Sequence, residues 1–349
     1  MLALAGTLFF PTLSVAGGSL RILSQNMNRL FDSIDDGRNE KIVSEQKFRQ
    51  RVNTAAGKIT GQFGMPDIIA LQEVENLNVL EQISSQVQKA SGIQYQSVIR
   101  EGNDISSINL AFLIRPKVEI RDVRQLFGRD LLRYDKTPLF SRPPLYLRAC
   151  FESSCISLLN LHLRSMRGLR SGNRSKRVNL KRLAQATAVA RWVDDFQRTR
   201  PQESLMLLGD FNALTPSDPI LDVVGTIRGD PDNSKTSSVA KDWVGQDLVD
   251  LTRKIPAARR YSYIYRKKKQ ILDYMLVNVR FKPKLRSISF SRIDYRFSDH
   301  AALIAEFGWL IIAGYGPAPG IVATAFQSTG LPSFQIQTPV FSPDTVARA

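Results

Sequence analysis

The chain has only two histidines, and each lies next to an apolar, strand-like run where acidic or amide side chains also occur. His162 follows one such run, and His300 stands directly after Asp299 and ahead of another. Imidazole exchanges protons near neutral pH, and carboxylates bind hard cations such as Mg²⁺. Because a sheet gathers the ends of its strands, these residues predict one cluster able to hold a metal ion and move protons.

Side chains of this kind occur at the ends of six predicted strands. A single polar residue at a strand end means little, and an asparagine there is often only a turn residue. Several carboxylates brought to one edge repel each other unless a cation holds them. The set consists of Asn26, Glu73, His162, Asp210, Asn212, Asp273, Asp299 and His300.

Apolar strand-like runs alternate with helix-like stretches over most of the chain, and no internal repeat is present. This alternation is typical of an α/β or mixed-sheet domain. The predicted strands are 20–26, 67–74, 108–115, 156–163, 204–211, 270–277 and 300–307, and the predicted helices are 44–62, 77–90 and 179–198.

Five motifs, LQEVEN, NLHLRS, LLGDFNA, ILDYMLV and FSDHAA, follow one another along the chain. In this order they resemble the endonuclease/exonuclease/phosphatase superfamily, which includes deoxyribonuclease I. FSRPPLY (140–146) and KRLAQATAVARWV (181–193) are similar to its secreted bacterial nuclease branch. The resemblance covers 20–307 and implies a four-layered α/β sandwich, with two packed mixed β-sheets flanked by helices. We expect this catalytic domain at 18–308.

The resemblance also implies roles for the clustered residues. Glu73 would hold the metal, with Asn26 and Asp299 as further ligands. Oxygen ligands favour Mg²⁺, with Mn²⁺ or Ca²⁺ as other candidate ions. The expected catalytic residues are His162, Asp210, Asn212, Asp273 and His300.

The proton acceptor has two assignments. In the first, Asp273 fixes the tautomer of His300, which removes a proton from the attacking water. In the second, Asp210 is the base and His300 holds the phosphate. His162 would act as an acid or stabilise developing charge on phosphorus, and Asn212 would donate to a phosphoryl oxygen.

One position departs from the family pattern, and one arginine has two interpretations. Ser106 and Ile108 stand where deoxyribonuclease I-like members carry a tyrosine and a glutamate, so the partner of His162 is not identified by the resemblance. Arg142 matches a family arginine near the substrate phosphate. The alternative for Arg142 is a surface arginine held by the neighbouring prolines.

The formal net charge of +16 points to a polyanionic partner. Nine basic residues and no acidic one lie between 164 and 191, and we expect Arg164, Arg167 and Arg170 to contact substrate. A second basic cluster, 259–269, carries tyrosines at alternate positions, which either stack on nucleobases or form one packed face of a strand. A solvated surface is the alternative for the first cluster.

The ends of the chain and its two cysteines indicate in which cellular compartment the protein is found. Residues 1–16 read as a signal peptide, with a buried N-terminal strand as the alternative. Cys150 and Cys155 flank a predicted hairpin turn that would bring them together as a disulfide, with free buried thiols as the alternative. The segment from Gly308 to Val340 has no charged residue, so we expect the tail 309–349 to be disordered.

The composition excludes two classes of protein. Hydrophobic residues make up 43% of the chain, which excludes a disordered protein, and two cysteines exclude a four-cysteine zinc site. The sequence predicts a secreted or periplasmic, Mg²⁺-dependent endonuclease acting on DNA or also RNA, with no stable membrane association and no protein partner. The alternatives are a phospholipase C-type hydrolase such as a secreted sphingomyelinase, and a non-catalytic nucleic-acid-binding or toxin-like subunit.

Overall fold

The computed structural model describes residues 17–152, 154–169, 171–214 and 220–310. The predicted signal peptide, 1–16, lies outside the described residues, as does the predicted tail 309–349 apart from its first two positions. Those two positions belong to strand β14 (Leu303–Leu310), so the last strand extends past the boundary expected at 308.

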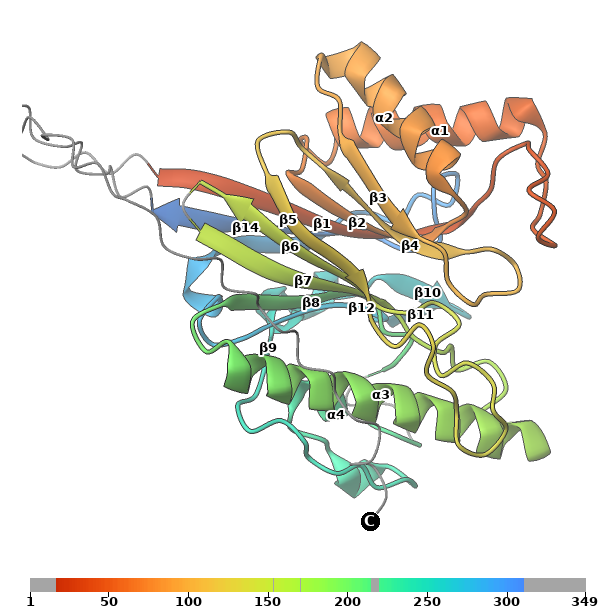
Figure 1. Ribbon diagram of the computed structural model, residues 1–349, viewed down its shortest axis with the longest axis vertical. Helices are drawn as coiled ribbons and strands as arrows, with labels where there is room; N and C mark the ends of the chain where they lie inside the picture. Colours follow the sequence, from red (N-terminus) through yellow and green to blue (C-terminus); the bar gives the residue numbers. More distant parts are fainter. Residues whose placement is uncertain (1–16, 153, 170, 215–219, 311–349) are drawn as a thin grey trace, which may run out of the picture. The chain divides into compact units, whose positions relative to one another are not determined.

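Two six-stranded mixed sheets form the centre of the fold (Figure 1). One pair of neighbouring strands in each sheet is parallel, β1 with β2 and β7 with β8, and the other pairs are antiparallel. The first sheet has the order β13 (Leu285–Phe290), β14, β1 (Gly17–Leu30), β2 (Ile68–Val74), β4 (Asn109–Ile114) and β3 (Gln96–Arg100). The second has the order β5 (Glu119–Gln125), β6 (Leu145–Phe151), β7 (Ser154–His162), β8 (Ser204–Asp210), β12 (Asp273–Val277) and β9 (Val249–Asp250).

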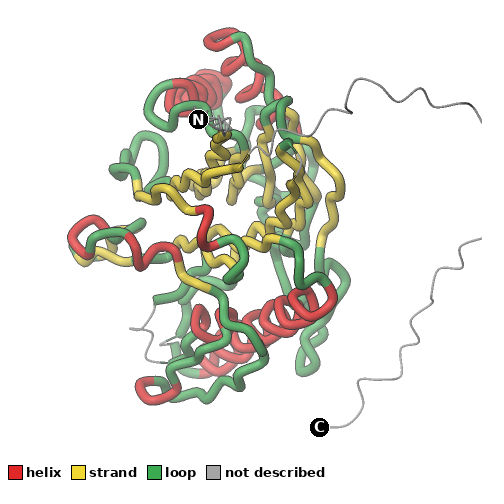
Figure 2. The backbone as a smooth tube through the Cα atoms, turned by 90° about the vertical axis from the view of Figure 1, so that its left-hand side faces the viewer, coloured by secondary structure: helices red, strands yellow, loops and turns green. Residues whose placement is uncertain are grey.

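Helices cover the outer face of each sheet (Figures 1 and 2). Helices α1 (Glu45–Thr60) and α2 (Leu77–Ser91) pack on the first sheet, and α3 (Asn173–Thr199) and α4 (Val223–Arg228) pack on the second. In the part of the chain that the structure describes, no helix is long and apolar enough to cross a membrane.

Side-chain alternation along the strands builds three stacked apolar cores. In β1, Ile22 faces the core between the sheets, whereas its neighbour Leu23 faces the core beneath α1 and α2. In β7, Leu158 faces the core between the sheets and Leu159 faces α3. Because both faces of these strands are covered, they read as continuous apolar runs in the sequence. The four-layered α/β sandwich predicted from the sequence is confirmed.

Each predicted strand and helix is present, with shifted ends. Strand β14 begins at Leu303, three residues after the predicted start, so Asp299 and His300 lie in the loop ahead of it. Helix α3 begins at Asn173, six residues before the predicted start. The sequence analysis missed the edge strands β3, β5 and β13, whose residues are mostly half-buried or exposed and so lack an apolar run.

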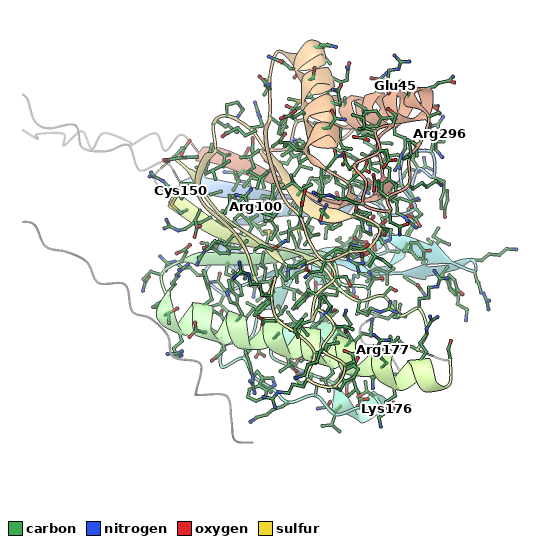
Figure 3. All side chains as sticks on the ribbon, turned by 45° about the vertical axis from the view of Figure 1, so that its right-hand side comes forward. Glu45, Arg100, Cys150, Lys176, Arg177 and Arg296 are labelled. Carbon is green, nitrogen blue, oxygen red and sulfur yellow. A yellow bond between two sulfur atoms is a disulfide. The ribbon has the colours of Figure 1, made fainter. Side chains whose placement is uncertain are left out.

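The predicted disulfide is confirmed. The antiparallel pairing of β6 with β7 sets Cys150 opposite Cys155, and the two sulfur atoms are bonded. Figure 3 shows Cys150 at one end of the sandwich and Arg296 at the other. The disulfide closes the β6–β7 hairpin at the end of β7 remote from His162.

Candidate active site

Three catalytic candidates lie side by side on neighbouring strands of the second sheet. The pairing of β7 with β8 sets His162 opposite Asp210, and the pairing of β8 with β12 sets Asp210 opposite Asp273. Gly209 has a φ of 128°, and a Cβ at this position would lie 2.1 Å from the carbonyl oxygen of Leu161. The glycine of the GDFN motif is therefore required by the close approach of β7 to β8 beside the site.

The first sheet contributes Asn26 and Glu73. Asn26 Nδ2 lies 3.2 Å from Glu73 Oε1 and 3.0 Å from Asp210 Oδ2, so this amide donates to a carboxylate on each sheet. Asn26 Oδ1 accepts from the backbone N–H of Asn28. The structure thus turns the amide nitrogen of Asn26 toward the carboxylates, whereas the sequence analysis expected an oxygen ligand there.

Glu73 occupies an irregular point of strand β2. Its φ is 59°, and the pairing of β2 with β4 shifts register between Gln72 and Val74. A bulge redirects the side chain that it carries, and a positive φ is strained for a residue other than glycine. Strand geometry therefore gives the Glu73 carboxylate, which is half-buried, its position beside the second sheet.

His300 is held by carboxylates. Its Nδ1 lies 2.7 Å from Asp273 Oδ2, and its Nε2 lies 4.0 Å from Asp210 Oδ2. Burial alone would lower the pKa of this imidazole, but the charge and hydrogen bond of Asp273, with the charges of Asp210 and Asp299, raise the pKa of His300 to about 10. These carboxylates therefore stabilise a positively charged His300 at neutral pH.

His162 has a different environment. Its Nε2 lies 3.6 Å from Glu73 Oε1 and 3.5 Å from Asp210 Oδ2. Its Nδ1 is buried and has no hydrogen-bond partner among the described residues, and Ile108, which stands where the family pattern has a glutamate, is a buried aliphatic side chain. Burial, followed by the charge of Arg142, lowers the pKa of His162 well below 6.5, so this imidazole is neutral.

Asp210 lies between His162 and Asp273 on the neighbouring strands. Asn212 donates to it twice, from its backbone N–H to Oδ1 at 2.8 Å and from Nδ2 to Oδ2 at 3.1 Å. Asn212 has a φ of 49°, which folds the chain back toward Asp210 directly after the strand. Burial, with the charges of Asp273 and Glu73, raises the pKa of Asp210 to about 7.

The carboxylates and histidines form two groups whose candidate ligand atoms lie within 4.8 Å of one another: Glu73, His162 and Asp210, and Asp210, Asp273 and His300. Because Asp273 already binds His300, Glu73 and Asp210 are the carboxylates free to hold a divalent ion. Their donor oxygens suit Mg²⁺ or Mn²⁺. Asp299, half-buried beside His300, belongs to neither group.

Arg142 lies next to this cluster and is not a free surface arginine. Its Nη1 lies 2.8 Å from Asp104 Oδ2, and its Nη2 donates to the backbone carbonyl of Leu163 at 3.2 Å. Leu163 directly follows His162, so the Arg142–Asp104 pair fastens the end of β7. The sequence analysis did not single out Asp104.

The basic segment 164–191 divides between a loop and the start of α3. Arg164 bonds back to Ser165 Oγ at 2.7 Å, and Arg167 is exposed, whereas Arg170 lies outside the described residues. Figure 3 shows Lys176 and Arg177 near the first turn of α3. The alternative of a solvated surface does not hold for the whole segment. Arg182, a further arginine of this segment, is buried and donates to the carbonyl of Asn212 at 2.7 Å.

The sequence analysis missed how closely the hairpin β10 (Tyr263–Tyr265) and β11 (Lys268–Gln270) adjoins the site. The Tyr263 ring packs against the His300 ring, with 5.0 Å between centroids. Ser262 Oγ accepts from the backbone N–H of Asp273 at 3.2 Å, and the Ser262 carbonyl accepts from Ala301 at 2.8 Å. The alternating tyrosines marked this segment, but no sequence signal placed Tyr263 on His300.

Two packed mixed sheets thus carry a buried carboxylate–histidine cluster at the ends of their central strands, where a divalent ion could be held. The chain belongs to the endonuclease/exonuclease/phosphatase family, whose model matches residues 21–287. Members of this family are metal-dependent phosphodiesterases and related hydrolases. Comparison with curated protein sequences gave no match.

Solved structures of low sequence identity share the fold. D. rerio TDP2 complexed with a single-strand DNA product is 14% identical, with a TM-score of 0.52, 83% of this chain covered and 98% of the other. A Bacteroides vulgatus family member is 14% identical, with a TM-score of 0.54 and coverages of 84% and 99%. The human Nocturnin catalytic domain with bound sulfate is 16% identical, with a TM-score of 0.52 and coverages of 83% and 94%.

Proposed function

We propose that the protein is a secreted, Mg²⁺-dependent endonuclease that hydrolyses phosphodiester bonds of DNA, with RNA as a further candidate substrate. The observation that carries this proposal is the pair of carboxylate–histidine groups that share Asp210 at the ends of β7 and β8. One group is Glu73, His162 and Asp210, and the other is Asp210, Asp273 and His300. The net charge of +16 and the complex of D. rerio TDP2 with a single-strand DNA product support nucleic acid as the substrate.

The side chains of the site have different roles, which follow from the charge that each carries. Glu73 would hold the divalent ion, which when bound supplies charge neutralisation and polarisation of the phosphoryl group. His300, kept positive by Asp273, presents Nε2 to a phosphoryl oxygen, and Asn212 donates a further hydrogen bond. Neutral His162 faces the same space between Glu73 and Asp210 and, as a hydrogen-bond donor, stabilises negative charge that develops on the phosphoryl oxygens.

We assign the proton acceptor for the attacking water to Asp210. His300 faces Asp273, Asp210 and Asp299, an environment that keeps its imidazole protonated and without a free lone pair. Asp210 lies between the two histidines, and two amide side chains, Asn26 and Asn212, fix its orientation. Of the two assignments that the sequence left open, this geometry favours Asp210 as base and His300 as the phosphate-binding group.

Nicking of a closed circular plasmid by the purified protein tests the activity. Mg²⁺ or Mn²⁺ should convert supercoiled plasmid to open circles and EDTA should abolish this, while an exonuclease could not open a closed circle. RNA cleavage and release of phosphocholine from sphingomyelin are measured in parallel. No cleavage of DNA or RNA in any metal would overturn the proposal, and release from sphingomyelin alone would favour the phospholipase alternative.

Export is the remaining part of the proposal. The predicted signal peptide 1–16 supports it, and so does the Cys150–Cys155 disulfide, because such bonds persist in oxidising compartments. Expression of the full chain in a bacterium with a secretory system should release a protein whose N-terminus is Gly17. Recovery of the intact chain only from the cytoplasm would contradict secretion.

A further inference from the structure

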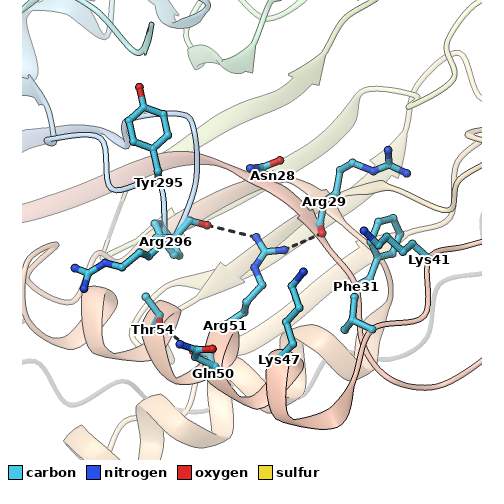
Figure 4. A pocket seen from close by; sticks show the side chains of 12 residues that line it. Asn28, Arg29, Phe31, Lys41, Lys47, Gln50, Arg51, Thr54, Tyr295 and Arg296 are labelled. Carbon is cyan, nitrogen blue, oxygen red and sulfur yellow. Dashed lines mark hydrogen bonds between the residues drawn. The ribbon is translucent and has the colours of Figure 1, made fainter.

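A basic cavity of about 490 Å³ lies beside the active site, and the mechanism above does not use it (Figure 4). Helix α1, the end of β1 and the segment 295–297 line it. Among the described residues that line the cavity, none is acidic, so its electrostatic potential is positive. The basic residues of the lining are Arg29, Lys41, Lys47, Arg51 and Arg296.

The half-buried guanidinium of Arg51 joins the segments that form the wall of this cavity. Arg51 Nη1 donates to the carbonyl of Arg29 at 2.8 Å, and Nη2 donates to the carbonyl of Phe297 (Figure 4). Nη2 also donates to the carbonyl of Met27. Asn28 and Arg29 are consecutive residues with positive φ, at 49° and 56°. Two consecutive residues with strained backbone conformations persist only where surrounding contacts fix them. The rest of the fold therefore stabilises this turn.

Several of the cavity's charges are available to an anion. Lys41 and Lys47 are exposed, and neither forms an ion pair within the portion of the chain that the structure describes. The Arg29 guanidinium lies over the Phe31 ring, 5.4 Å from its centroid, and is exposed. Cations that lack carboxylate partners and share one concavity favour a ligand with more than one negative charge.

The cavity adjoins the catalytic cluster through the chain itself. Asn28 lies two residues after Asn26, and Phe297 lies three residues before His300. At the rim, Tyr295 is 66% exposed, which leaves its ring free to stack. A nucleic-acid strand whose scissile phosphate lies at His300 would therefore bring neighbouring phosphates and bases to this cavity.

We propose that the cavity binds backbone phosphates of a single nucleic-acid strand beside the scissile phosphate, through Arg29, Lys41 and Lys47, with Tyr295 stacked on a base. The inference rests on the proposed nuclease function and assigns part of its substrate path to a surface outside the basic segments 164–191 and 259–269. Phosphate contacts supply affinity without sequence preference, and aromatic stacking selects unpaired bases.

Binding of a fluorescein-labelled single-stranded 20-mer DNA in EDTA, followed by anisotropy at several salt concentrations, tests the inference. The full chain is compared with the variant Lys41→Gln/Lys47→Gln. The control is Arg280→Gln/Lys282→Gln, which removes two exposed charges beyond the end of β12 remote from Asp273. Loss of two phosphate contacts should weaken binding roughly tenfold and reduce the salt slope by about 1.4, whereas the control changes neither.

A second variant tests the stacking contact. Tyr295→Ala should lower affinity for the single-stranded 20-mer about tenfold and affinity for the same sequence as a duplex much less. Equal losses on both substrates would show that Tyr295 does not stack on an unpaired base. Equal binding by the lysine variant and its control, or no binding of the 20-mer by the parent, would overturn the inference.

Two further outcomes distinguish this inference from a lipid-binding site and from the proposed nuclease function. Phosphatidylglycerol vesicles are tested with the same proteins, and a loss of vesicle binding without a loss of 20-mer binding would make the cavity a lipid contact and overturn the inference. Hydrolysis enters none of these readouts. A protein that cleaves no nucleic acid but loses 20-mer affinity in the lysine variant would overturn the proposed function and leave the cavity assignment standing.

Discussion

Asn26 Nδ2 lies 3.0 Å from Asp210 Oδ2, and this hydrogen bond joins β1 in one sheet to the end of β8 in the other. The same amide donates to Glu73, so one side chain sets the spacing between Glu73, which would hold a divalent ion, and Asp210, the proposed proton acceptor. The active site therefore depends on how the two sheets are registered against each other. Contacts between the sheets beneath the site should affect catalysis as well as stability.

Asn160 is such a contact. Its Oδ1 accepts from Gln72 Nε2 at 2.8 Å, and its Nδ2 donates to the carbonyls of Leu71 and Ala111. Asn160→Ala would remove three buried hydrogen bonds, so we expect the free energy of unfolding to fall by roughly 3 kcal/mol. We also expect kcat to fall, because Glu73 follows Gln72. Urea unfolding and plasmid nicking measure both effects. A normal kcat in the folded variant would show that this contact does not position the site.

The Asp273–His300 pair should control both activity and stability. Asp273→Asn keeps the shape of the side chain but removes the charge that holds His300 positive and oriented. We expect nicking to slow by roughly 100-fold or more, and the melting temperature to fall as well, because the variant breaks a buried pair that raises the pKa of His300. Asp195→Asn, an exposed change on α3, is the matched control and should nick at the parent rate. Equal rates for the two variants would remove His300 from the mechanism.

Gly209 should tolerate no side chain. Gly209→Ala places a Cβ 2.1 Å from the Leu161 carbonyl at a φ of 128°, so we expect a loss of roughly 2 kcal/mol or more in unfolding free energy. Gly57→Ala, in helix α1 with open space around the new Cβ, should stabilise the protein by about 0.5–1 kcal/mol. Urea denaturation compares the two variants. A stable Gly209→Ala protein would contradict the close approach of β7 and β8.

The Arg142–Asp104 pair should make stability depend on acidic pH. Burial would raise the pKa of Asp104, but the Arg142 charge and hydrogen bonds from Ser106 outweigh it and lower the pKa below 3.8. The stabilisation is therefore present above the unfolded-state pKa and is lost as pH falls through the folded-state pKa. In urea titrations, Asp104→Asn should be less stable than the parent at pH 7, and the difference should shrink below about pH 4. A difference that stays constant from pH 7 to pH 3 would exclude this linkage.

The disulfide should affect stability without affecting catalysis. Cys150 and Cys155 are five residues apart, and a loop this short restricts the unfolded chain by only about 2 kcal/mol. The variant Cys150→Ser/Cys155→Ser should lose about that much unfolding free energy and nick plasmid at the parent rate, because His162 lies at the other end of β7. Unfolding and nicking are measured in the same buffer. A large loss of activity in the folded variant would mean that the hairpin end is coupled to the site.

The sequence was sufficient for the parts of the fold that are buried on both faces. Strands β2, β4 and β8 are continuous apolar runs because sheets or helices cover them completely, and each was located from its composition. The edge strands β3 and β5 were missed, because exposed faces need no apolar residues. The polar residues at the strand ends were recognisable in the sequence because they interrupt the apolar runs.

Amino-acid types and motif order thus determined the layered fold, the family and the residues that gather at the site. Tertiary structure decided how those residues are used. The amide of Asn26 donates to two carboxylates, Asp104 holds Arg142, and Tyr263 packs on His300. Spacing along the chain cannot specify such contacts, because hydrogen bonds and burial join residues that are far apart in sequence, and the resulting desolvation and charge leave His300 positive and His162 neutral.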